Sequence, residues 1–449
     1  MKLHQAFGVV RGDVIAFVGA GGKTSTLIGL GYELAEMGWR VLATTTTAIA
    51  EEQLSLFPHV LAADVDSDVI SQALNTDRFV FLYSDMAQGV VRGPAPQQIT
   101  HLMDAVDSDV LLVEADVASG LPLKAPFEHE PMIPPETSLV ILVASLSALG
   151  KPLDEQHVYN VQSIIDRYGF KAGNRIKSPW IAQVLRDEEL GLRNISSDLR
   201  VVAFLNRTSS AGYGRARARL IARLALRRSR LHGVAIGSVR ATKPIYEVQR
   251  PIGAIVLAAG MSTRMGQPKV LLPWTDKHTI IEHIVEQLIN SRLQHIVVVT
   301  GNHAKTVKQQ MKPMGVQTTY NRSYRSGEML SSLKAGLRMM PDHVSAALIV
   351  LGDQPRIQPR VIYKIMMAYA EGKGDIIAPS FENRRGHPIL ISRRYWSELL
   401  NLPRGSSPRT VINTHQDEIY YVNVNTDSIL RDVDTPEDYN QERWRAGLK

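Results

Sequence analysis

The sequence predicts an α/β protein built from two units, and three observations lead to this prediction. Apolar runs typical of buried parallel strands alternate with helical patterns along all 449 residues, of which 44% are hydrophobic. A glycine-rich turn follows a strand-like run twice, at 19–24 and at 257–269. Prolines interrupt the pattern between 240 and 251. We therefore expect a P-loop-like α/β domain over 1–245 and a Rossmann-like α/β domain over 251–449.

The first glycine-rich turn has the composition of a phosphate-binding loop. A buried strand is expected at 14–18, and a helix after the turn that ends near Gly38. Backbone N–H groups at a helix N-terminus attract anions, Lys23 can reach outer phosphates, and Thr24 can ligate magnesium. Phe17 stands where Walker A has its first glycine, so the loop is closer to the compact Gly-x-x-Gly-Lys-Thr loop of the Mur ligases. The alternative is a glycine-rich turn with a surface lysine. The expected nucleotide contacts are Gly19, Gly21, Gly22, Lys23 and Thr24.

Two further strands are expected to end beside this turn. The strand 40–43 runs into four threonines, 44–47, although such a β-branched run is also typical of the strand itself. The strand 110–113 delivers Glu114 and Asp116 at the position of a Walker B acid. We expect Asp116 and Thr24 to serve a metal ion. Helical segments are predicted at 155–168 and 179–186.

The second glycine-rich turn carries one arginine and one lysine. It follows a strand expected at 252–257, and its two glycines allow the backbone to approach a phosphate. Arg264 and Lys269 supply positive charge, as stabilisation of a leaving pyrophosphate requires. A helix at 280–289 and a strand at 295–299 follow. The expected nucleotide contacts are Leu257, Ala258, Ala259, Gly260 and Gly266.

Acidic residues near the end of the chain predict a metal site. The strand 346–351 leads into Asp353, and ligands of open α/β sheets lie beyond the carboxyl ends of strands. Asp353 therefore falls where Mg²⁺ (or Mn²⁺) bridging phosphates is needed, with Asp434 or Asp432 as the second carboxylate. Asp353 can alternatively cap a helix that starts near Pro359 or close a turn, and Asp434 can equally be the N-cap of the last helix.

From about 252 to 440 the chain resembles the molybdenum cofactor nucleotidyltransferases, and within them the cytidylyltransferase (MocA-like) branch. Four blocks carry the resemblance: 257–274, 326–336, 351–355, and 385–388 together with 432–438. It implies a GT-A-like nucleotidyltransferase domain that moves CMP from CTP to the terminal phosphate of molybdopterin and releases pyrophosphate. It also implies contacts with nucleotide or pterin by Ser331, Ser332, Gly386 and His387, although a lone histidine before proline is more often structural. Ala259 favours CTP, because the guanylyl-transferring branch has glycine there.

From about 8 to 240 the chain resembles the YqeC-like accessory proteins of selenium-dependent hydroxylases. The glycine-rich turn, the threonine run and the block from Glu114 to Pro134 carry this resemblance. It implies nucleotide binding and a link to molybdenum hydroxylase maturation, with a client hydroxylase as partner. Val117 departs from the family, which continues Glu-Ala-Asp with glycine, so the turn after Asp116 can differ here.

Two other functions fit the same motifs. One is a nucleotidyltransferase with another acceptor, such as a sugar phosphate or methylerythritol phosphate, although Gln354-Pro355 and the Arg-Gly-His-Pro block argue against it. The other is a nucleotide-sensing module that delivers cofactor to a client hydroxylase.

Charge and composition exclude several classes of protein. The net charge of +7 equals the charge of seven arginines between 215 and 230, several of them at i, i+4 spacing. We expect these arginines to form the solvated face of one amphipathic helix, with docking to an acidic partner as the alternative. No aromatic residue interleaves them, so nucleic acid is not expected as a partner. Absence of cysteine excludes disulfides and iron–sulfur clusters. No signal-peptide pattern and no apolar run approaching about 18 residues occurs, so we expect a cytoplasmic protein without membrane contact.

Overall fold

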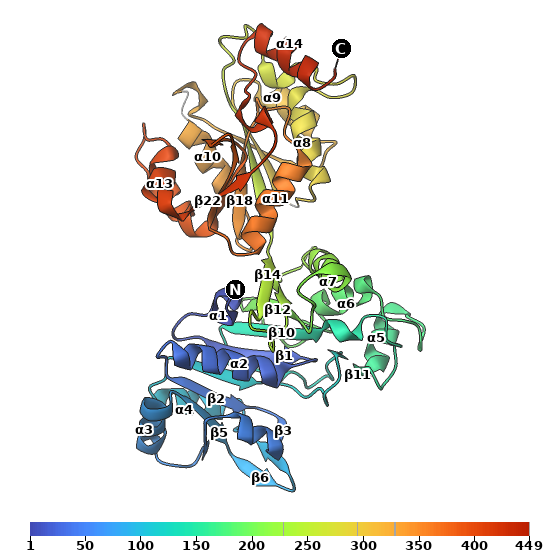
Figure 1. Ribbon diagram of the computed structural model, residues 1–449, viewed down its shortest axis with the longest axis vertical. Coiled ribbons are helices and arrows are strands. Elements are labelled where there is room, and N and C mark those ends of the chain that lie inside the picture. Colours follow the sequence, from blue (N-terminus) through green and yellow to red (C-terminus); the bar gives the residue numbers. More distant parts are fainter. Residues whose placement is uncertain (228, 294, 327–328, 449) are drawn as a thin grey trace. The chain divides into compact units, whose positions relative to one another are not determined.

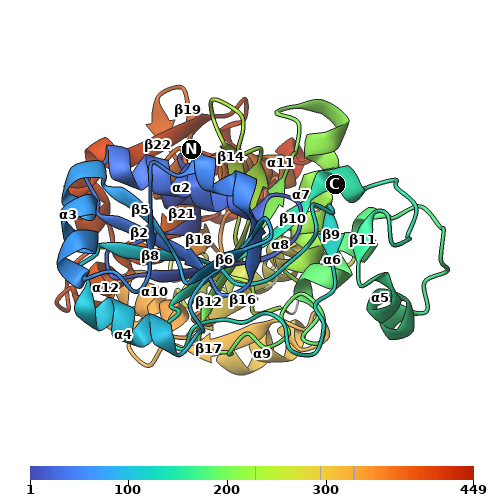
Figure 2. The same cartoon turned by 90° about the horizontal axis from the view of Figure 1, so that it is seen from below.

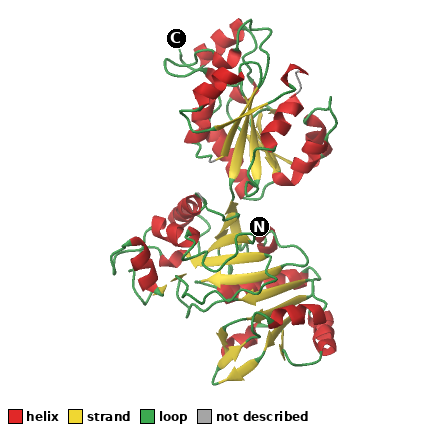
Figure 3. Ribbon diagram, turned by 180° about the vertical axis from the view of Figure 1, so that it is seen from behind, coloured by secondary structure: helices red, strands yellow, loops and turns green. Residues whose placement is uncertain are grey.

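The computed structural model divides the chain into two compact units, Met1–Gln249 and Arg250–Lys449. It describes residues 1–227, 229–293, 295–326 and 329–448. In each unit the strands gather in the interior with helices around them, which confirms the α/β class that the sequence predicts (Figures 1 and 3). None of the helices in the described ranges is both long and apolar enough to cross a membrane.

Unit 1 is organised around one large sheet whose strands run in the order β14-β13-β12-β10-β1-β8-β2-β5-β4. All neighbours pair in parallel except β13 and β14. The strands of this sheet are β1 (Val14–Gly19), β2 (Val41–Thr45), β4 (His59–Ala62), β5 (Phe79–Tyr83), β8 (Val110–Glu114), β10 (Leu139–Ser145), β12 (Arg200–Asn206), β13 (Gly233–Gly237) and β14 (Ile245–Gln249). Short strands form two smaller groups: β3 (Ala48–Ala50), β6 (Asp85–Ala87) and β7 (Val90–Arg92), and β9 (Leu123–Lys124) with β11 (Val158–Tyr159).

Helices cover both faces of this sheet. Their bounds are α1 (Leu3–Phe7), α2 (Lys23–Glu36), α3 (Ser67–Asp77), α4 (Gln98–Ala105), α5 (Val161–Tyr168), α6 (Ser178–Arg186) and α7 (Gly212–Ala225). Successive side chains of β1 enter different clusters: Ile15 and Phe17 pack with α2, whereas Ala16 and Val18 pack with the α6 and α7 side. Figure 2 shows α2 and α4 on opposite sides of β2, β5 and β8. The strands are therefore apolar on both faces, as parallel sheets are.

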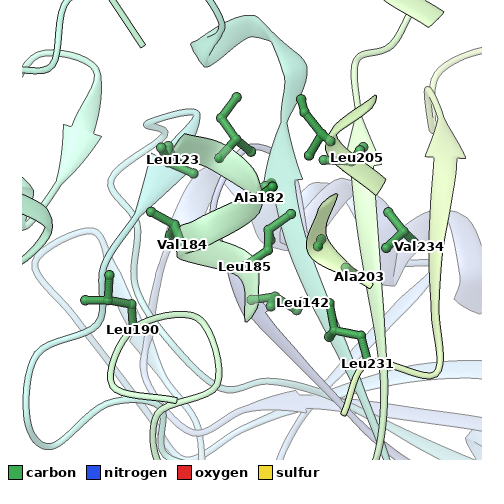
Figure 4. Packing of buried hydrophobic residues seen from close by; sticks show 14 of the residues in the cluster. Leu123, Leu142, Ala182, Val184, Leu185, Leu190, Ala203, Leu205, Leu231 and Val234 are labelled. Atoms are coloured by element: carbon green, nitrogen blue, oxygen red, sulfur yellow. The ribbon is translucent and has the colours of Figure 1, made fainter. Parts of the chain in front are cut away.

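On one face of this sheet, α6 packs against β10 and β12. Leu185 of α6 lies beside Leu142 of β10, and Ala203 and Leu205 of β12 belong to the same cluster (Figure 4).

The predicted helix 155–168 is partly wrong, because the chain first forms β11 and α5 begins only at Val161. Strand β11 pairs with β9, which draws these residues out of helical geometry.

Unit 2 contains a mixed sheet in the order β17-β16-β15-β18-β21-β19-β20, with β22 pairing with β19. Ala254 and Val256 of β15 pack with α8 and α11, whereas Ile255 packs with α10 and α12, so helices again cover both faces. The strands are β15 (Ile252–Ala258), β16 (His295–Thr300), β17 (Gln317–Tyr320), β18 (Ala346–Leu351), β19 (Ile376–Phe381), β20 (Arg384–Arg385), β21 (Ile389–Ser392) and β22 (Ile419–Asn423). The helices are α8 (Ile280–Asn290), α9 (Ala304–Met311), α10 (Met329–Leu337), α11 (Pro359–Ala370), α12 (Trp396–Asn401), α13 (Arg409–Thr414) and α14 (Pro436–Arg445).

The alternative cap prediction for the last helix is wrong. Thr435, and not Asp434, caps α14: its hydroxyl accepts from the Asp438 backbone N–H, and the Asp438 carboxylate accepts from the backbone N–H of Thr435. The carboxylate of Asp434 is thereby left for other contacts.

The predicted solvated face of the arginine-rich helix is wrong for two of its arginines, Arg215 and Arg219, because both contact a buried carboxylate. Arg219 of α7 donates to both carboxylate oxygens of Glu247, at 2.7 and 2.8 Å, and Arg215 adds a contact of 3.3 Å. Glu247 belongs to β14 and is fully buried. Two of the arginines therefore neutralise an interior carboxylate. Arg228, one of the seven arginines between 215 and 230, lies outside the described residues.

Candidate functional site

In unit 2, one lysine lies between two aspartates that are far apart in the sequence. The Lys269 Nζ is 2.5 Å from Asp353 Oδ2 and 3.0 Å from Asp434 Oδ1. Arg264 Nη1 lies 2.9 Å from the other oxygen of Asp434. The structure thus brings together four residues that the sequence predicts for one site. We call Asp353 and Asp434 the acidic pair.

The positions of these residues follow from the strands that carry them. β15 and β18 are parallel neighbours with Leu257 in register with Leu351, so the loop after β15 and Asp353 after β18 meet at one edge of the sheet. The backbone N–H of Val433 donates to the Asp353 carbonyl at 2.9 Å, which brings the C-terminal acidic segment to the same edge. Glycine at 352 lets the chain after β18 pass close to the end of β15, because a Cβ there would lie 2.7 Å from the Leu257 carbonyl oxygen.

The acidic pair keeps Lys269 charged. Burial alone would lower the pKa of Lys269, but the charges and hydrogen bonds of Asp353 and Asp434 outweigh burial and raise that pKa. The ammonium group is therefore a fixed positive charge at neutral pH, at the point where the glycine-rich loop ends.

The third aspartate is held separately. Gln354 Nε2 donates to Asp432 Oδ1 at 2.7 Å, and no hydrogen bond or ion pair joins Asp432 to Lys269. Burial raises the pKa of Asp432, and the neighbouring charges of Asp353 and Asp434 raise it further. Sequence reasoning did not predict that Gln354 would hold this carboxylate.

The acidic pair has suitable chemistry for Mg²⁺ or Mn²⁺. Carboxylate oxygens are the ligands of these cations, and Mg²⁺ commonly takes one or two carboxylates together with water and substrate phosphates. Among residues 1–227, 229–293, 295–326 and 329–448 there is no group of three or more acidic, histidine or cysteine side chains arranged to hold a metal. Two carboxylates around Lys269 thus fit a metal that arrives with phosphate ligands, and such a metal would compete with Lys269 for them.

The loop after β15 offers its backbone to a ligand. Ala258 and Ala259 are buried in the core, so any ligand contact from them comes from main-chain atoms. A Cβ at Gly260 would meet open space, and Gly266 has a φ of +72°, which favours glycine. Ser262 Oγ accepts from the backbone N–H of Lys269 at 3.1 Å and closes the loop.

Ser331 and Ser332 lie at the start of α10 and share one partner that the sequence did not reveal. Asn321 Nδ2 lies 2.9 Å from the hydroxyl oxygen of each serine. Asn321 and Ser331 line a cavity of about 480 Å³. The cations at its wall are Arg322, Lys334, Arg338 and Arg404. Gly327 and Glu328, which belong to the block that resembles the cytidylyltransferases, lie outside the described residues.

Gly386 and His387 line a second cavity of about 280 Å³ whose wall is largely apolar. Gly386 packs tightly, since a Cβ there would lie 2.3 Å from the Ile429 carbonyl oxygen. Burial lowers the pKa of His387 to about 4, and the charges of Arg385 and Arg409 contribute. His387 is therefore neutral at pH 7, and its role in contacting nucleotide or pterin stays a prediction.

The pKa of His387 predicts acid sensitivity of unit 2. Above about pH 6.5 the imidazole is neutral in the folded and unfolded states; below it only the unfolded state gains the proton, until the pH falls to about 4. We expect the free energy of unfolding to decrease over this window by up to roughly 3 kcal/mol. Unfolding of the wild type and of His387→Gln at pH 7 and pH 4.5 checks this, with His303→Gln at the start of α9 as control. Equal pH dependence in wild type and His387→Gln would contradict it.

In unit 1 the first glycine-rich turn forms a tight loop between β1 and α2. A Cβ at Gly21 would lie 2.4 Å from the Ser145 Cβ, and one at Gly22 would lie 2.4 Å from Asn206 Nδ2. Both glycines also have positive φ, at +82° and +126°. The conformation therefore depends on glycine at both positions. Gly19 donates its backbone N–H to Asp116 Oδ2 at 2.8 Å, which ties the loop to the end of β8.

Lys23 and Thr24 contact the acidic end of β8. Thr24 Oγ1 donates to Glu114 Oε2 at 2.7 Å. Lys23 Nζ donates to the Gly19 carbonyl at 2.9 Å and lies 3.0 Å from Asp116 Oδ1. Its pKa is raised because Asp116 and Glu114 outweigh the effect of burial. The predicted Thr24 and Asp116 thus meet at one strand edge, with Glu114 as an additional carboxylate next to Thr24.

Buried carboxylates outnumber buried ammonium groups around this loop. Lys124 Nζ contacts Glu130 at 2.9 Å and Asp116 at 3.2 Å, so Lys23 and Lys124 face Glu114, Asp116 and Glu130. Burial raises the pKa of Glu114, which Lys23 and Thr24 only partly offset. The carboxyl groups of this cluster, with the Thr24 hydroxyl beside Glu114, offer the oxygen ligands that a divalent cation takes.

A cavity of about 370 Å³ opens over the loop. It is lined by residues 21–25, Glu114, residues 48–50, Gln53 and the turn 117–120. Arg207, at the end of β12, also lines it. Sequence reasoning missed Asn206 and Arg207, because only the order of the strands brings the end of β12 near the loop.

Unit 2 has the architecture of nucleotidyltransferases: a glycine-rich loop with a lysine and an arginine faces a strand-end aspartate in a Rossmann-like sheet. The model of the MobA-like NTP transferase domain matches residues 254–419, and the model of the YqeC protein matches residues 15–162. The chain belongs to the YqeC family through its N-terminal unit and carries a MobA-like NTP transferase domain in its C-terminal unit. Both predicted resemblances are thereby confirmed.

The curated relatives divide between the two units. The chain is 35% identical to the uncharacterized protein YqeC of Escherichia coli over 199 residues, which are 44% of this chain and 77% of that protein. It is 27% identical over 190 residues to the molybdenum cofactor cytidylyltransferase of Escherichia coli, covering 42% of this chain and 93% of that protein. A probable molybdenum cofactor guanylyltransferase of Bacillus cereus is 30% identical over 138 residues, covering 31% of this chain and 66% of that protein.

Proposed function

We propose that unit 2 transfers CMP from CTP to the terminal phosphate of molybdopterin and releases pyrophosphate. The observation that carries the proposal is the contact of Lys269 with both Asp353 and Asp434 at the edge where the glycine-rich loop ends. The similarity to the cytidylyltransferase supports this choice of nucleotide and acceptor. Ala259, where the guanylyl-transferring branch has glycine, supports CTP over GTP.

The chain's own residues act by positioning and by charge. Arg264 and Lys269 neutralise the pyrophosphate as the bond to the α-phosphorus breaks, and the loop backbone orients the triphosphate. A phosphate oxygen of the acceptor is the nucleophile, so no protein side chain has to form a covalent intermediate. Asp353 and Asp434 would hold the magnesium ion, which supplies charge neutralisation between phosphates when bound. Asn321 with Ser331 and Ser332, and His387 beside Gly386, are placed to contact nucleotide or pterin.

Unit 1 serves this activity as a nucleotide-binding accessory unit in the maturation of a client molybdenum hydroxylase. The support is the loop Gly19–Thr24, its contacts with Glu114 and Asp116, and the cavity above it. The combination of this unit with a nucleotidyltransferase domain in one chain supports a shared role.

One assay tests the transfer reaction. The full chain is incubated with molybdopterin, Mg²⁺ and each of CTP, GTP and ATP, and pyrophosphate release and the dinucleotide product are followed. We expect turnover with CTP at least about 10-fold faster than with GTP, a difference in transition-state free energy of about 1.4 kcal/mol. Turnover with CTP and a sugar phosphate in place of molybdopterin, or preference for GTP, would contradict the proposed substrates.

A further inference from the structure

One arginine faces the phosphate loop of unit 1 without a partner. Arg207 follows β12 and lines the 370 Å³ cavity together with Lys23 and Thr24. Within the described ranges its guanidinium group makes no hydrogen bond, ion pair or ring contact, whereas the Lys23 ammonium is occupied by carboxylates. Arg207 therefore brings a positive charge with several N–H donors, which no carboxylate of the described residues contacts, to the wall of this cavity.

The backbone at this position is built to place the side chain. Arg207 has a φ of +54°, a left-handed conformation that is uncommon for residues other than glycine. The buried Asn206 maintains it: Oδ1 accepts from the backbone N–H groups of Arg207 at 2.8 Å and Val239 at 3.1 Å, and Nδ2 donates to the Gly21 carbonyl at 3.0 Å. One side chain thus connects the arginine directly to the phosphate loop. Local strain of this kind is concentrated at functional sites.

The remaining cavity wall suits a nucleotide with its phosphates at the loop. Ala48, Ile49 and Val117 contribute apolar surface to the cavity wall, while Thr24 and Glu114 provide oxygen ligands at the strand edge. The volume is within the range of small-molecule sites. An arginine supplied by the same chain, facing a phosphate loop, is the arrangement that stabilises charge on a phosphoryl group during transfer.

We propose that unit 1 is a second catalytic site, which hydrolyses the terminal phosphoanhydride bond of a nucleoside triphosphate with Arg207 as a catalytic residue. The proposal rests on the nucleotide binding proposed above. A water oxygen bonds to the terminal phosphorus, and the bond from that phosphorus to the bridging oxygen breaks. The nucleoside diphosphate leaves with the electron pair, and the proton of the water passes to solvent. The guanidinium group stabilises the negative charge on the oxygens of the transferred group.

The test uses the full chain with Mg²⁺ and ATP, GTP, CTP or UTP, in the absence of molybdopterin. Release of inorganic phosphate and nucleotide binding by calorimetry are measured separately. For Arg207→Ala we expect kcat to fall on the order of 1000-fold with nucleotide affinity changed by less than about 10-fold, and Arg207→Lys to recover part of the rate. Because Arg207 is exposed, neither variant removes a buried contact.

Arg78→Ala is the matched control. Arg78 is also exposed, has a φ of +62°, and lies in unit 1 before β5, at the opposite ends of the parallel strands. Its side chain does not line the cavity, and we expect wild-type phosphate release. Asp353→Ala should also keep phosphate release in this assay while losing pyrophosphate release in the separate assay with CTP and molybdopterin, which assigns the phosphate release to unit 1.

Three results would overturn the inference in distinguishable ways. Phosphate release by Arg207→Ala at the wild-type rate would remove Arg207 from the reaction. Nucleotide binding that Lys23→Ala weakens, without phosphate release in the wild type, would refute catalysis and leave the proposed nucleotide-binding function of unit 1 standing. Absence of nucleotide binding to the wild type, or equal binding by the wild type and by Lys23→Ala, would refute both proposals for unit 1.

Discussion

Asp353→Ala is expected to reduce pyrophosphate release by unit 2 by at least about 100-fold, with little effect on folding. The carboxylate lies 2.5 Å from Lys269, at the edge where a magnesium-bound triphosphate would be held. Its removal eliminates half of the acidic pair and leaves Lys269 with Asp434 alone. The side chain of Asp353 is 23% exposed and beyond the end of β18, so truncation opens no interior cavity. We expect the free energy of unfolding to change by less than about 1 kcal/mol.

Steady-state kinetics with CTP and molybdopterin, together with denaturant unfolding, measure both effects. Asp353→Asn separates charge from shape, because it keeps the side-chain volume and removes the negative charge; we expect it to be nearly as slow. Asp417→Asn is the control, since Asp417 is an exposed aspartate of the same unit in the turn Gln416–Glu418. A wild-type rate in Asp353→Ala would exclude a metal ligand at this position. A loss of activity in Asp417→Asn would show that the rate responds to the loss of any negative charge in unit 2 and not to Asp353 in particular.

Local patterns predicted the parts of both sites that are contiguous in sequence. The loop Gly19–Thr24 and the strand-end Asp353 each follow an apolar run, and a strand followed by glycine or a carboxylate already determines where that residue lies on a parallel sheet. Asp434 or Asp432 was predicted to share a metal site with Asp353, whereas the ion pair of Asp434 with Lys269 was not predicted.

Contacts that depend on strand order could not be predicted in this way. Asn206 reaches Gly21 because β12, β10 and β1 are successive strands of the sheet, which no spacing in the sequence expresses. Gln354 was part of a recognised block, yet its hydrogen bond with Asp432 depends on how the C-terminal segment returns to β18. Polar partners from distant segments are therefore the information that the structure adds.

The arginine-rich helix shows the same limit. The i, i+4 spacing of Arg215 and Arg219 gives the face of α7 on which they lie, but it does not give the element that packs there. Residues 240–251 read as a break between domains because of their prolines, whereas residues 245–249 form β14, which pairs antiparallel with β13. Glu247 in that strand is the partner of both arginines.

Glu247→Ala is consequently expected to destabilise unit 1 by about 3 kcal/mol. Glu247 is fully buried, and its carboxylate accepts two hydrogen bonds from Arg219 and one from Arg215. Its removal takes a fully buried carboxylate away from the two guanidinium groups that donate to it, which costs more than the loss of an exposed pair. Because both arginines keep some contact with water, at 20% and 32% exposure, the lower end of the range for buried ion pairs applies.

Hydrogen–deuterium exchange of the full chain, read on peptides from α7, β13 and β14, measures this loss within unit 1 even if unit 2 unfolds separately. We expect faster exchange in all three elements of Glu247→Ala and an intermediate effect in Glu247→Gln, which keeps the shape and part of the hydrogen bonding. Glu155→Ala, at an exposed carboxylate of the same unit, should exchange as the wild type does. If Glu247→Ala also exchanged as the wild type does, the two arginines would be ordinary surface charges. Loss of protection confined to β14 would mean that the carboxylate stabilises the strand but not its attachment to α7.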